Sequence, residues 1–184
     1  CLYVPRRYAE LAEKCACNDR WMKKTKIGSG AFGKVYQACR FQGQNLVVKV
    51  QQNDQFAKAE FKAYKALQNK HILPKLLAVW VCKGKMYMVL EQLYDCVQPV
   101  GILMKRLDTK VQKLFELGWL HCDLHWGNVM CKKNNRVVLI DFGLSVQKGK
   151  GPYENQPNYT FGELRKLQTE QFDELKLERL SKSS

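Results

Sequence analysis

The chain has few acidic side chains and few histidines, and it has no long apolar run. No segment approaches the roughly 18 apolar residues that a membrane-spanning helix needs, and no secretory signal segment is visible. Only 17 acidic residues stand against 31 basic ones, which gives a formal net charge of +14 over 184 residues. This surplus favours polyanionic partners, namely acidic protein segments, nucleic acid or anionic surfaces. Solvated lysine side chains without a partner are the alternative, and no motif supports nucleic acid.

The eight cysteines are enough for a disulfide framework, but their positions favour reduced thiols. Cys15 and Cys17 lack the CxxC spacing and the neighbouring histidines of a zinc site. Other cysteines lie inside apolar runs, where a reduced cysteine behaves as a small hydrophobic residue. These are Cys39, Cys82, Cys122 and Cys131.

Hydrophobic periodicity and turn residues predict strands in the first half and mostly helices in the second. Residues 1–20 form a lead-in with a helix from Pro5 to about Cys17. The elements expected next are strand–turn–strand over 22–36, a turn at 42–45, a strand at 46–50, a helix at 54–69, and strands at 76–82 and 85–92. After them we expect a helix at 102–120 closed by Gly118, short strands at 129–131 and 136–140, a loop at 147–160, and a helix at 161–180.

The first informative motif is the glycine-rich turn in the segment from Ile27 to Val35, IGSGAFGKV. Because glycine has no side chain, the backbone amides of such a turn can approach phosphate groups closely. Phe32, at its tip, would shield the bound phosphates from water. The chain continues past the turn as a strand rather than a helix, which argues against a dinucleotide-binding fingerprint.

Lys49 follows on the apolar strand Val47-Val48-Lys49-Val50. A lysine is costly to bury in such a strand unless it is paired. Glu60, on the predicted helix at 54–69, is the candidate partner. The alternative is an exposed lysine at a strand end and a surface glutamate.

Two polar motifs come later, HCDLHWGN at residues 121–128 and Asp141-Phe142-Gly143. Asp123 and Asn128 are five residues apart, and Asp141 directly follows an apolar strand that would deliver its carboxylate at a strand end. Each acidic residue alone is consistent with an ordinary turn. In this order, with the glycine turn and Lys49 before them, they indicate one phosphate-handling site.

Together these motifs resemble the protein-kinase-like superfamily over roughly residues 25–145. The resemblance implies an α+β, bilobal fold. An N-lobe at 21–92 would hold a five-stranded antiparallel sheet and one helix, and a reduced, mainly helical C-lobe would span 93–184. The helix around Glu60 resembles that of casein-kinase-like enzymes. The short C-lobe resembles that of compact atypical kinases of the Bud32-like and RIO-like type.

The resemblance also implies ATP and Mg²⁺ as cofactors and assigns roles to residues. Asp123 would accept or orient the proton of the substrate hydroxyl. Lys49, paired with Glu60, would hold the α- and β-phosphates, and Asn128 and Asp141 would coordinate Mg²⁺. Leu90 would be the gatekeeper, and Glu91 and Leu93 would flank the adenine through the hinge backbone. The remaining nucleotide contacts would be Ile27, Gly28, Gly30, Phe32, Gly33 and Val35.

The chain departs from the family pattern at several positions. Cys122 replaces an arginine that pairs with a phosphorylated activation loop, which predicts independence of such phosphorylation. His125 replaces the usual lysine and supplies less fixed positive charge, as in small-molecule phosphotransferases. No Ala-Pro-Glu anchor follows Gly143, so a protein partner that completes the C-lobe is an alternative to a self-contained lobe. The apolar stripe of the last helix would pack on its own lobe or bind that partner.

The leading prediction is an ATP-dependent protein kinase that phosphorylates Ser/Thr hydroxyls of protein substrates. Two alternatives stay open: a small-molecule phosphotransferase, and a catalytically weak kinase mimic that binds a partner kinase or substrate. A kinase of this type implies a reducing, nucleotide-rich compartment, the cytoplasm or nucleus. Reduced kinases occur in large DNA viruses as well as in cells.

Overall fold

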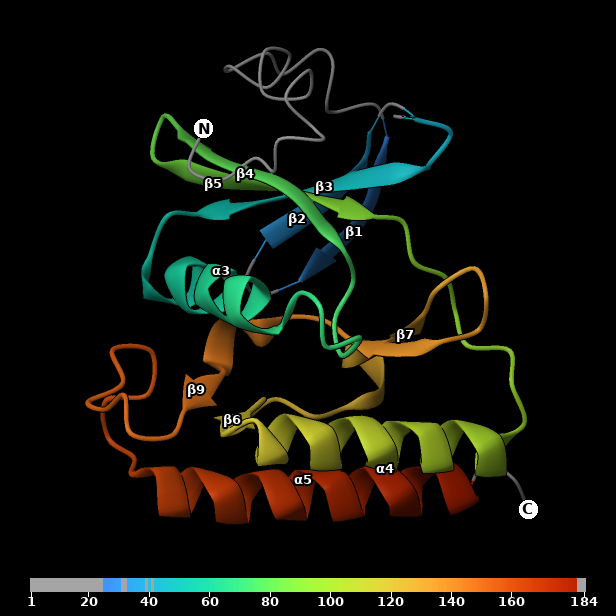
Figure 1. Cartoon of the computed structure of the whole chain (residues 1–184), viewed down its shortest axis with the longest axis vertical. Helices are drawn as coiled ribbons and strands as arrows, with labels where there is room; N and C mark the ends of the chain where they lie inside the picture. The colour runs from blue at the N-terminus through green and yellow to red at the C-terminus, as the bar shows by residue number, and fades with distance from the viewer. Residues whose placement is uncertain (1–24, 31–32, 39, 41, 182–184) are drawn as a thin grey trace. The chain divides into compact units, whose positions relative to one another are not determined.

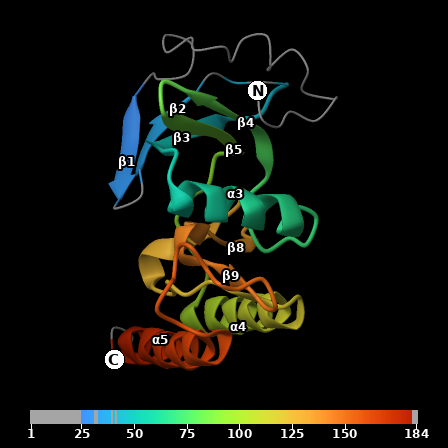
Figure 2. The ribbon, with the colours of Figure 1, turned by 90° about the vertical axis from the view of Figure 1, so that its left-hand side faces the viewer.

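Figures 1 and 2 show the computed structural model of the chain, which describes residues 25–30, 33–38, 40 and 42–181. The predicted lead-in, Phe32 and Cys39 lie outside the described residues. Two compact units make up the chain, residues 1–58 with 74–92 and residues 59–73 with 93–184. The lobe boundaries expected from the sequence stay predictions. Within the described residues, no helix is both long and apolar enough to cross a membrane.

A five-stranded antiparallel sheet forms most of the first unit and confirms the predicted N-lobe sheet. Its strands lie in the order β1-β2-β3-β5-β4. Their bounds are β1 Lys26–Gly30, β2 Gly33–Gln37, β3 Leu46–Gln52, β4 Leu76–Cys82 and β5 Lys85–Glu91.

Successive side chains of a strand point to opposite sides of the sheet. One face of this sheet is apolar, and the other carries Lys49. Trp80 lies opposite Tyr87 in the β4–β5 register, and the two rings stack with centroids 5.3 Å apart. On that face lies an apolar core whose members include Leu46, Val48, Val50, Leu77, Trp80, Tyr87 and Val89. Lys49 lies opposite Val35 on β2 and Met88 on β5, so these three side chains share the other face.

The second unit contains most of α3 (Gln55–Leu67), and α4 (Val100–Glu116) and α5 (Phe161–Ser181). The long helices α4 and α5 lie side by side in both views (Figures 1 and 2). Two small antiparallel sheets accompany them, β6–β9 and β7–β8. The short elements are β6 Trp119–Leu120, η2 Trp126–Asn128, β7 Val129–Cys131, β8 Val137–Leu139, η3 Phe142–Leu144 and β9 Val146–Gln147.

Local chemistry explains where the long helices begin and end. Pro99 precedes α4, and Gly118, with φ of +76°, closes it in a left-handed conformation that favours glycine. Thr160 and Glu163 form a capping box at the start of α5, in which each side chain accepts a hydrogen bond from the other residue's backbone N–H. The predicted bounds of α5 are therefore close to those observed, whereas α4 ends at Glu116, and Trp119 and Leu120, which were predicted to be helical, form β6 beyond Gly118.

The last helix packs its apolar stripe inside its own unit, as the simpler of the two sequence interpretations predicts. Leu164, Phe172 and Leu175 are buried, whereas Leu167 is 38% exposed. Leu164 joins a core cluster with Leu120 and the loop that follows it. The stripe is therefore largely used within the chain.

The prediction of reduced cysteines is wrong at two positions. Cys96 and Cys131 form a disulfide across 35 residues of sequence, and Cys82 is also disulfide-bonded. Among the described cysteines, Cys122 alone is a free thiol, and it is buried. The reason is topological: Tyr94 pairs with Cys131 in an isolated β-bridge, which carries Cys96 to the end of β7. These disulfides therefore remove the cysteines as an argument for the reducing compartment that the sequence predicted.

We expect the Cys96→Ala/Cys131→Ala variant to lose about 2–4 kcal/mol of unfolding free energy, because the cross-link restricts the unfolded chain. Urea unfolding measures the loss, with Cys122→Ala as a control that removes an unpaired sulfur. A digest of the non-reduced protein should contain the two cysteines in one linked peptide. Recovery of both as separate, alkylatable thiols would contradict the disulfide.

Candidate active site

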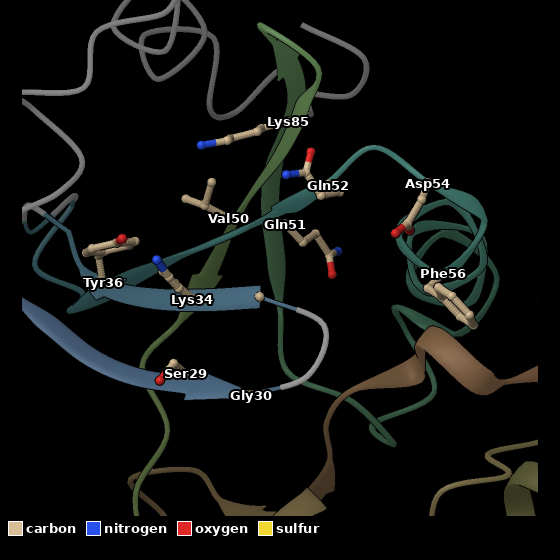
Figure 3. A pocket seen from close by; sticks show the side chains of 11 residues that line it. Ser29, Gly30, Lys34, Tyr36, Val50, Gln51, Gln52, Asp54, Phe56 and Lys85 are labelled. Carbon is tan, nitrogen blue, oxygen red and sulfur yellow. The ribbon is translucent and has the colours of Figure 1, made fainter.

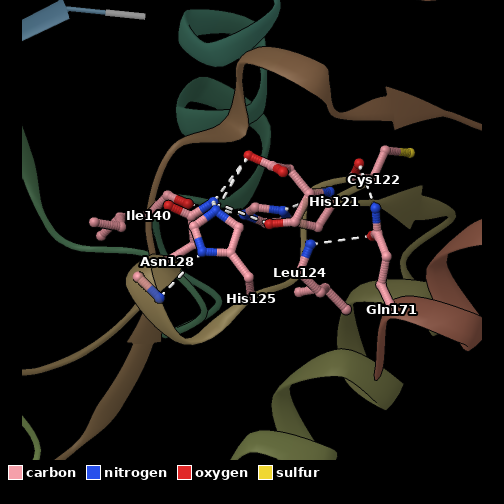
Figure 4. A network of polar contacts seen from close by, with 9 residues as sticks. His121, Cys122, Leu124, His125, Asn128, Ile140 and Gln171 are labelled. Carbon is pink, nitrogen blue, oxygen red and sulfur yellow. Dashed lines mark hydrogen bonds and ion pairs between the residues drawn. The ribbon is translucent and has the colours of Figure 1, made fainter. Parts of the chain in front are cut away.

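The loop between β6 and β7 holds the polar motif at residues 121–128 (Figure 4). Its central carboxylate belongs to Asp123, whose side chain is 28% exposed. The Asn128 amide nitrogen donates hydrogen bonds to the Asp123 backbone carbonyl at 2.9 Å and to its Oδ2 at 3.0 Å. The structure therefore brings together two residues that the sequence assigned to one site, and it fixes the rotamer of the carboxylate.

His125 adds an imidazole to this pair. Its Nδ1 accepts the Gly127 backbone N–H at 3.1 Å, and its Nε2 lies 3.0 Å from the Asn128 amide nitrogen. That Nε2 lies 3.7 Å from Asp123 Oδ2. The His125 side chain is 57% exposed.

His121 positions the backbone beneath Asp123. The ring is fully buried, and burial lowers its pKa, so the imidazole is neutral. One tautomer satisfies both nitrogens: Nε2–H donates to the Ile140 carbonyl at 2.8 Å, and Nδ1 accepts the Asp123 N–H at 3.3 Å. This single side chain therefore connects the loop to the residue just before Asp141.

Aromatic packing continues from that histidine. The Phe142 ring meets His121 edge-to-face with centroids 4.6 Å apart, and it meets Tyr64 of α3 at 6.4 Å. Tyr64 and Phe142 are almost fully buried. The segment that bears Asp141 is therefore anchored by the aromatic residue that follows it.

Asp141 lies at the end of the segment after β8, as the sequence predicts for a strand-delivered carboxylate. Its backbone adopts a left-handed conformation with φ of +65° and precedes η3. The Ile140 N–H donates to the Asn128 carbonyl at 3.0 Å, which ties this segment to the loop that carries Asn128. Asp123, Asn128 and Asp141 thus lie on two hydrogen-bonded segments of one unit.

Two glutamines of α5, which the sequence did not single out, form hydrogen bonds with the backbone of the same loop. Gln168 is buried, and its carbonyl oxygen accepts the backbone N–H groups of His121 and Cys122. Gln171 accepts the Leu124 N–H at 3.1 Å and donates to the Cys122 carbonyl at 3.2 Å (Figure 4). The sequence offered one signal for these two glutamines, namely that they interrupt the apolar stripe of α5.

Cys122, at the position where the family pattern has arginine, is an unreactive structural residue. Its backbone has φ of +63°, and its side chain joins the core formed with Leu120 and Val146. Burial, with a smaller contribution from the Asp123 charge, raises the pKa of the thiol to about 12. The side chain offers no positive charge for a phosphorylated loop, and the independence of such phosphorylation stays a prediction.

In the first unit, the described residues of the glycine-rich segment form the two predicted strands, which pair antiparallel with Gly28 opposite Val35. Gly33 has a steric role, since a Cβ there would lie 2.7 Å from the Val50 carbonyl oxygen. Val35 and Lys49 share one sheet face, and Lys49 is buried. Ile27 is half exposed.

A cavity of about 470 Å³ opens beside the same hairpin (Figure 3). Of the predicted nucleotide-binding residues that the structure describes, only Gly30 and Gly33 line it. Lys34, Lys85 and Asp54 supply its charges. It does not coincide with the predicted site.

The remaining predicted residues are Glu91, Leu93 and Glu60, and they are divided between the two units. Glu91 ends β5 in the first unit, its carboxylate accepts the Lys75 N–H at 2.6 Å, and Leu93 begins the next segment of the second unit. Glu60 is 1% exposed and belongs to the second unit, whereas Lys49 belongs to the first. The Lys49–Glu60 pair and the hinge contacts therefore stay predictions.

Comparison with known proteins agrees with the motifs and the fold. The protein kinase domain model matches residues 21–162, and the chain belongs to this family. A solved structure, the kinase PK-1 of Cydia pomonella granulovirus, superposes with a TM-score of 0.60 at 18% identity, over 78% of this chain and 60% of that one. This likeness confirms the kinase-like fold.

Similar sequences include kinases of different acceptor classes. A casein kinase I homolog from Encephalitozoon cuniculi is 28% identical over 72% of this chain and 48% of its own length. Mouse protein-tyrosine kinase 6 is 32% identical over 65% of this chain and 31% of its own length. The probable serine/threonine-protein kinase zyg-1 of Caenorhabditis briggsae is 30% identical over 68% of this chain and 20% of its own length. The chain spans about half or less of these relatives.

Gln168→Leu should destabilise the loop at residues 121–128, because it removes the acceptor of two buried backbone N–H groups at nearly constant volume. We expect a loss of about 1–3 kcal/mol in unfolding free energy. Hydrogen exchange of a peptide covering residues 119–124 should also become faster. Gln112→Leu, at an exposed glutamine of α4, is the matched control. Unchanged protection in the Gln168 variant would show that the glutamine does not hold the loop.

The raised pKa of Cys122 predicts resistance to alkylation. At pH 8 a thiol with this pKa is ionised in only about one molecule in 10⁴, so iodoacetamide should label Cys122 in the folded protein only slowly. In urea, labelling should increase as the pH passes through the ordinary thiol range. Mass spectrometry of the Cys122 peptide follows both reactions. Rapid labelling of the folded protein at pH 8 would contradict the burial.

Proposed function

We propose that the chain is an active ATP-dependent protein kinase that transfers the γ-phosphate to Ser/Thr hydroxyls of protein substrates. The observation that carries the proposal is the Asp123 carboxylate held by the Asn128 amide, with Asp141 on the adjoining segment. Asp123 accepts or orients the proton of the acceptor hydroxyl. Its side chain is 28% exposed, which supports this role, because an acceptor hydroxyl must be able to reach the carboxylate.

The metal ligands that we propose are the side-chain oxygens of Asn128 and Asp141. Since the Asn128 nitrogen donates to Asp123, its Oδ1 faces away from that carboxylate. An amide oxygen and a carboxylate suit Mg²⁺, which binds through few protein groups and completes its shell with phosphate oxygens and water. When bound, the ion neutralises charge on the transferred phosphoryl group.

On the nucleotide side, Lys49 and Val35 share a sheet face, which supports a common role in holding ATP. The burial of both Lys49 and Glu60 supports their pairing, because a buried charge requires an opposite partner. Gly28, Gly30 and Gly33 supply backbone amides to the phosphates. Glu91 and Leu93 contact the adenine through their backbone.

Asp123→Ala should lower phosphoryl transfer by about 10²–10⁴-fold, because it removes the group that handles the acceptor proton. ATP affinity, measured by calorimetry with Mg²⁺, should change by no more than a few-fold. The assay uses γ-labelled ATP with an acidic and a basic protein substrate, followed by phosphoamino-acid analysis.

Asp108→Ala, at an exposed aspartate of α4, is the matched control. Equal turnover in the Asp123 variant would remove Asp123 from this role. Label on tyrosine would overturn the Ser/Thr assignment. ATP binding without any label on protein would indicate the mimic or a small-molecule acceptor instead.

A further inference from the structure

Positive side chains gather at one place in the second unit, where α4 packs against the β7–β8 hairpin. Lys110 and Lys113 lie one turn apart on α4, and Lys132 and Arg136 flank the turn between the strands. We name these four residues the basic cluster.

Helix geometry explains why the α4 cations face that turn. At 100° per residue, Lys110 and Lys113 lie on the same side of the helix as Arg106, along one edge of the buried stripe that includes Leu107. Arg106 donates to the Asn135 carbonyl of the turn at 2.8 Å. The acidic Asp108 lies about 160° from Lys110, on the far side of the helix.

The pKa of Lys110 also indicates that these positive charges lie close together. Its pKa is lowered, first by partial burial and then by the charges of Lys113, Arg136 and Lys132. Like charges held this close destabilise the protein that carries them. An anionic ligand would offset that repulsion.

The turn that carries half of the cluster is held by several bonds. Lys132 and Arg136 pair through a backbone hydrogen bond of 2.9 Å, and the Asn135 N–H donates to the Lys132 carbonyl at 2.8 Å. Gln98 donates to the Asn135 carbonyl at 2.7 Å, and the Cys96–Cys131 disulfide ends one residue before Lys132. A surface fixed in this way loses little conformational entropy on binding.

From this arrangement we propose that the basic cluster is a docking surface for an acidic, Asp/Glu-rich segment of a partner protein. Charge complementarity carries the choice: four cations converge on a compact surface of a chain with net charge +14. The surface is separate from the Asp123 loop and would hold a partner without using the transfer chemistry.

Fluorescence anisotropy with a labelled ten-residue glutamate peptide tests the proposal in the absence of nucleotide, so the result does not depend on catalysis. Lys110→Gln/Arg136→Gln should weaken binding by about fivefold or more at low salt, because two charge contacts are lost. Lys150→Gln/Lys166→Gln is the matched control, with the same charge change at exposed positions elsewhere in the second unit. Thermal unfolding of each variant verifies that it is folded.

The charge-reversed variant Lys110→Glu/Arg136→Glu leaves the four positions with no net charge, so it should bind the glutamate peptide more weakly than the glutamine variant does. Equal weakening in the cluster and control variants would overturn the proposal in favour of a general effect of net charge. Tighter binding of a ten-nucleotide RNA than of the peptide, lost in the cluster variant, would replace the protein partner by nucleic acid.

Discussion

The segment at residues 121–125, which presents Asp123, is buried on one side without being helix or sheet, so its backbone groups need partners from elsewhere in the unit. An unpaired buried N–H costs free energy comparable to a lost hydrogen bond. Gln168, Gln171 and the His121 ring supply these partners, and α5 is the element that brings the glutamines there. The geometry of the candidate site therefore depends on a helix that follows it by some forty residues.

This dependence explains how the loop stays ordered within the second unit. Helix α5 performs two tasks, since Leu164, Phe172 and Leu175 fill the core and the glutamines between them bind the loop. Trp126 adds a third attachment by donating from its indole to the Leu175 carbonyl at 3.2 Å. The same helix therefore packs the core and fixes the geometry of the candidate site.

The predictions from sequence succeeded where the signal was local. Apolar runs and turn residues located the strands, a valine-rich strand marked Lys49, and Gly118 marked the end of α4, because backbone propensity acts within a few residues. The cysteines were misjudged because a reduced thiol and a bridged one look alike in an apolar run. Gln168 and Gln171 were overlooked because an amide in a helix has no signature until its partners are known.

By itself, the sequence determined the kinase-like fold and the order of its elements, and it singled out Asp123, Asn128 and Asp141 by type and spacing. These features depend on local propensity and on motifs whose chemistry requires particular side chains. Only the tertiary structure decided that Asn128 binds the Asp123 carboxylate, that Cys96 meets Cys131, and that four cations converge beside α4. Such pairings join residues distant in sequence, and they arise only when packing closes the chain between them.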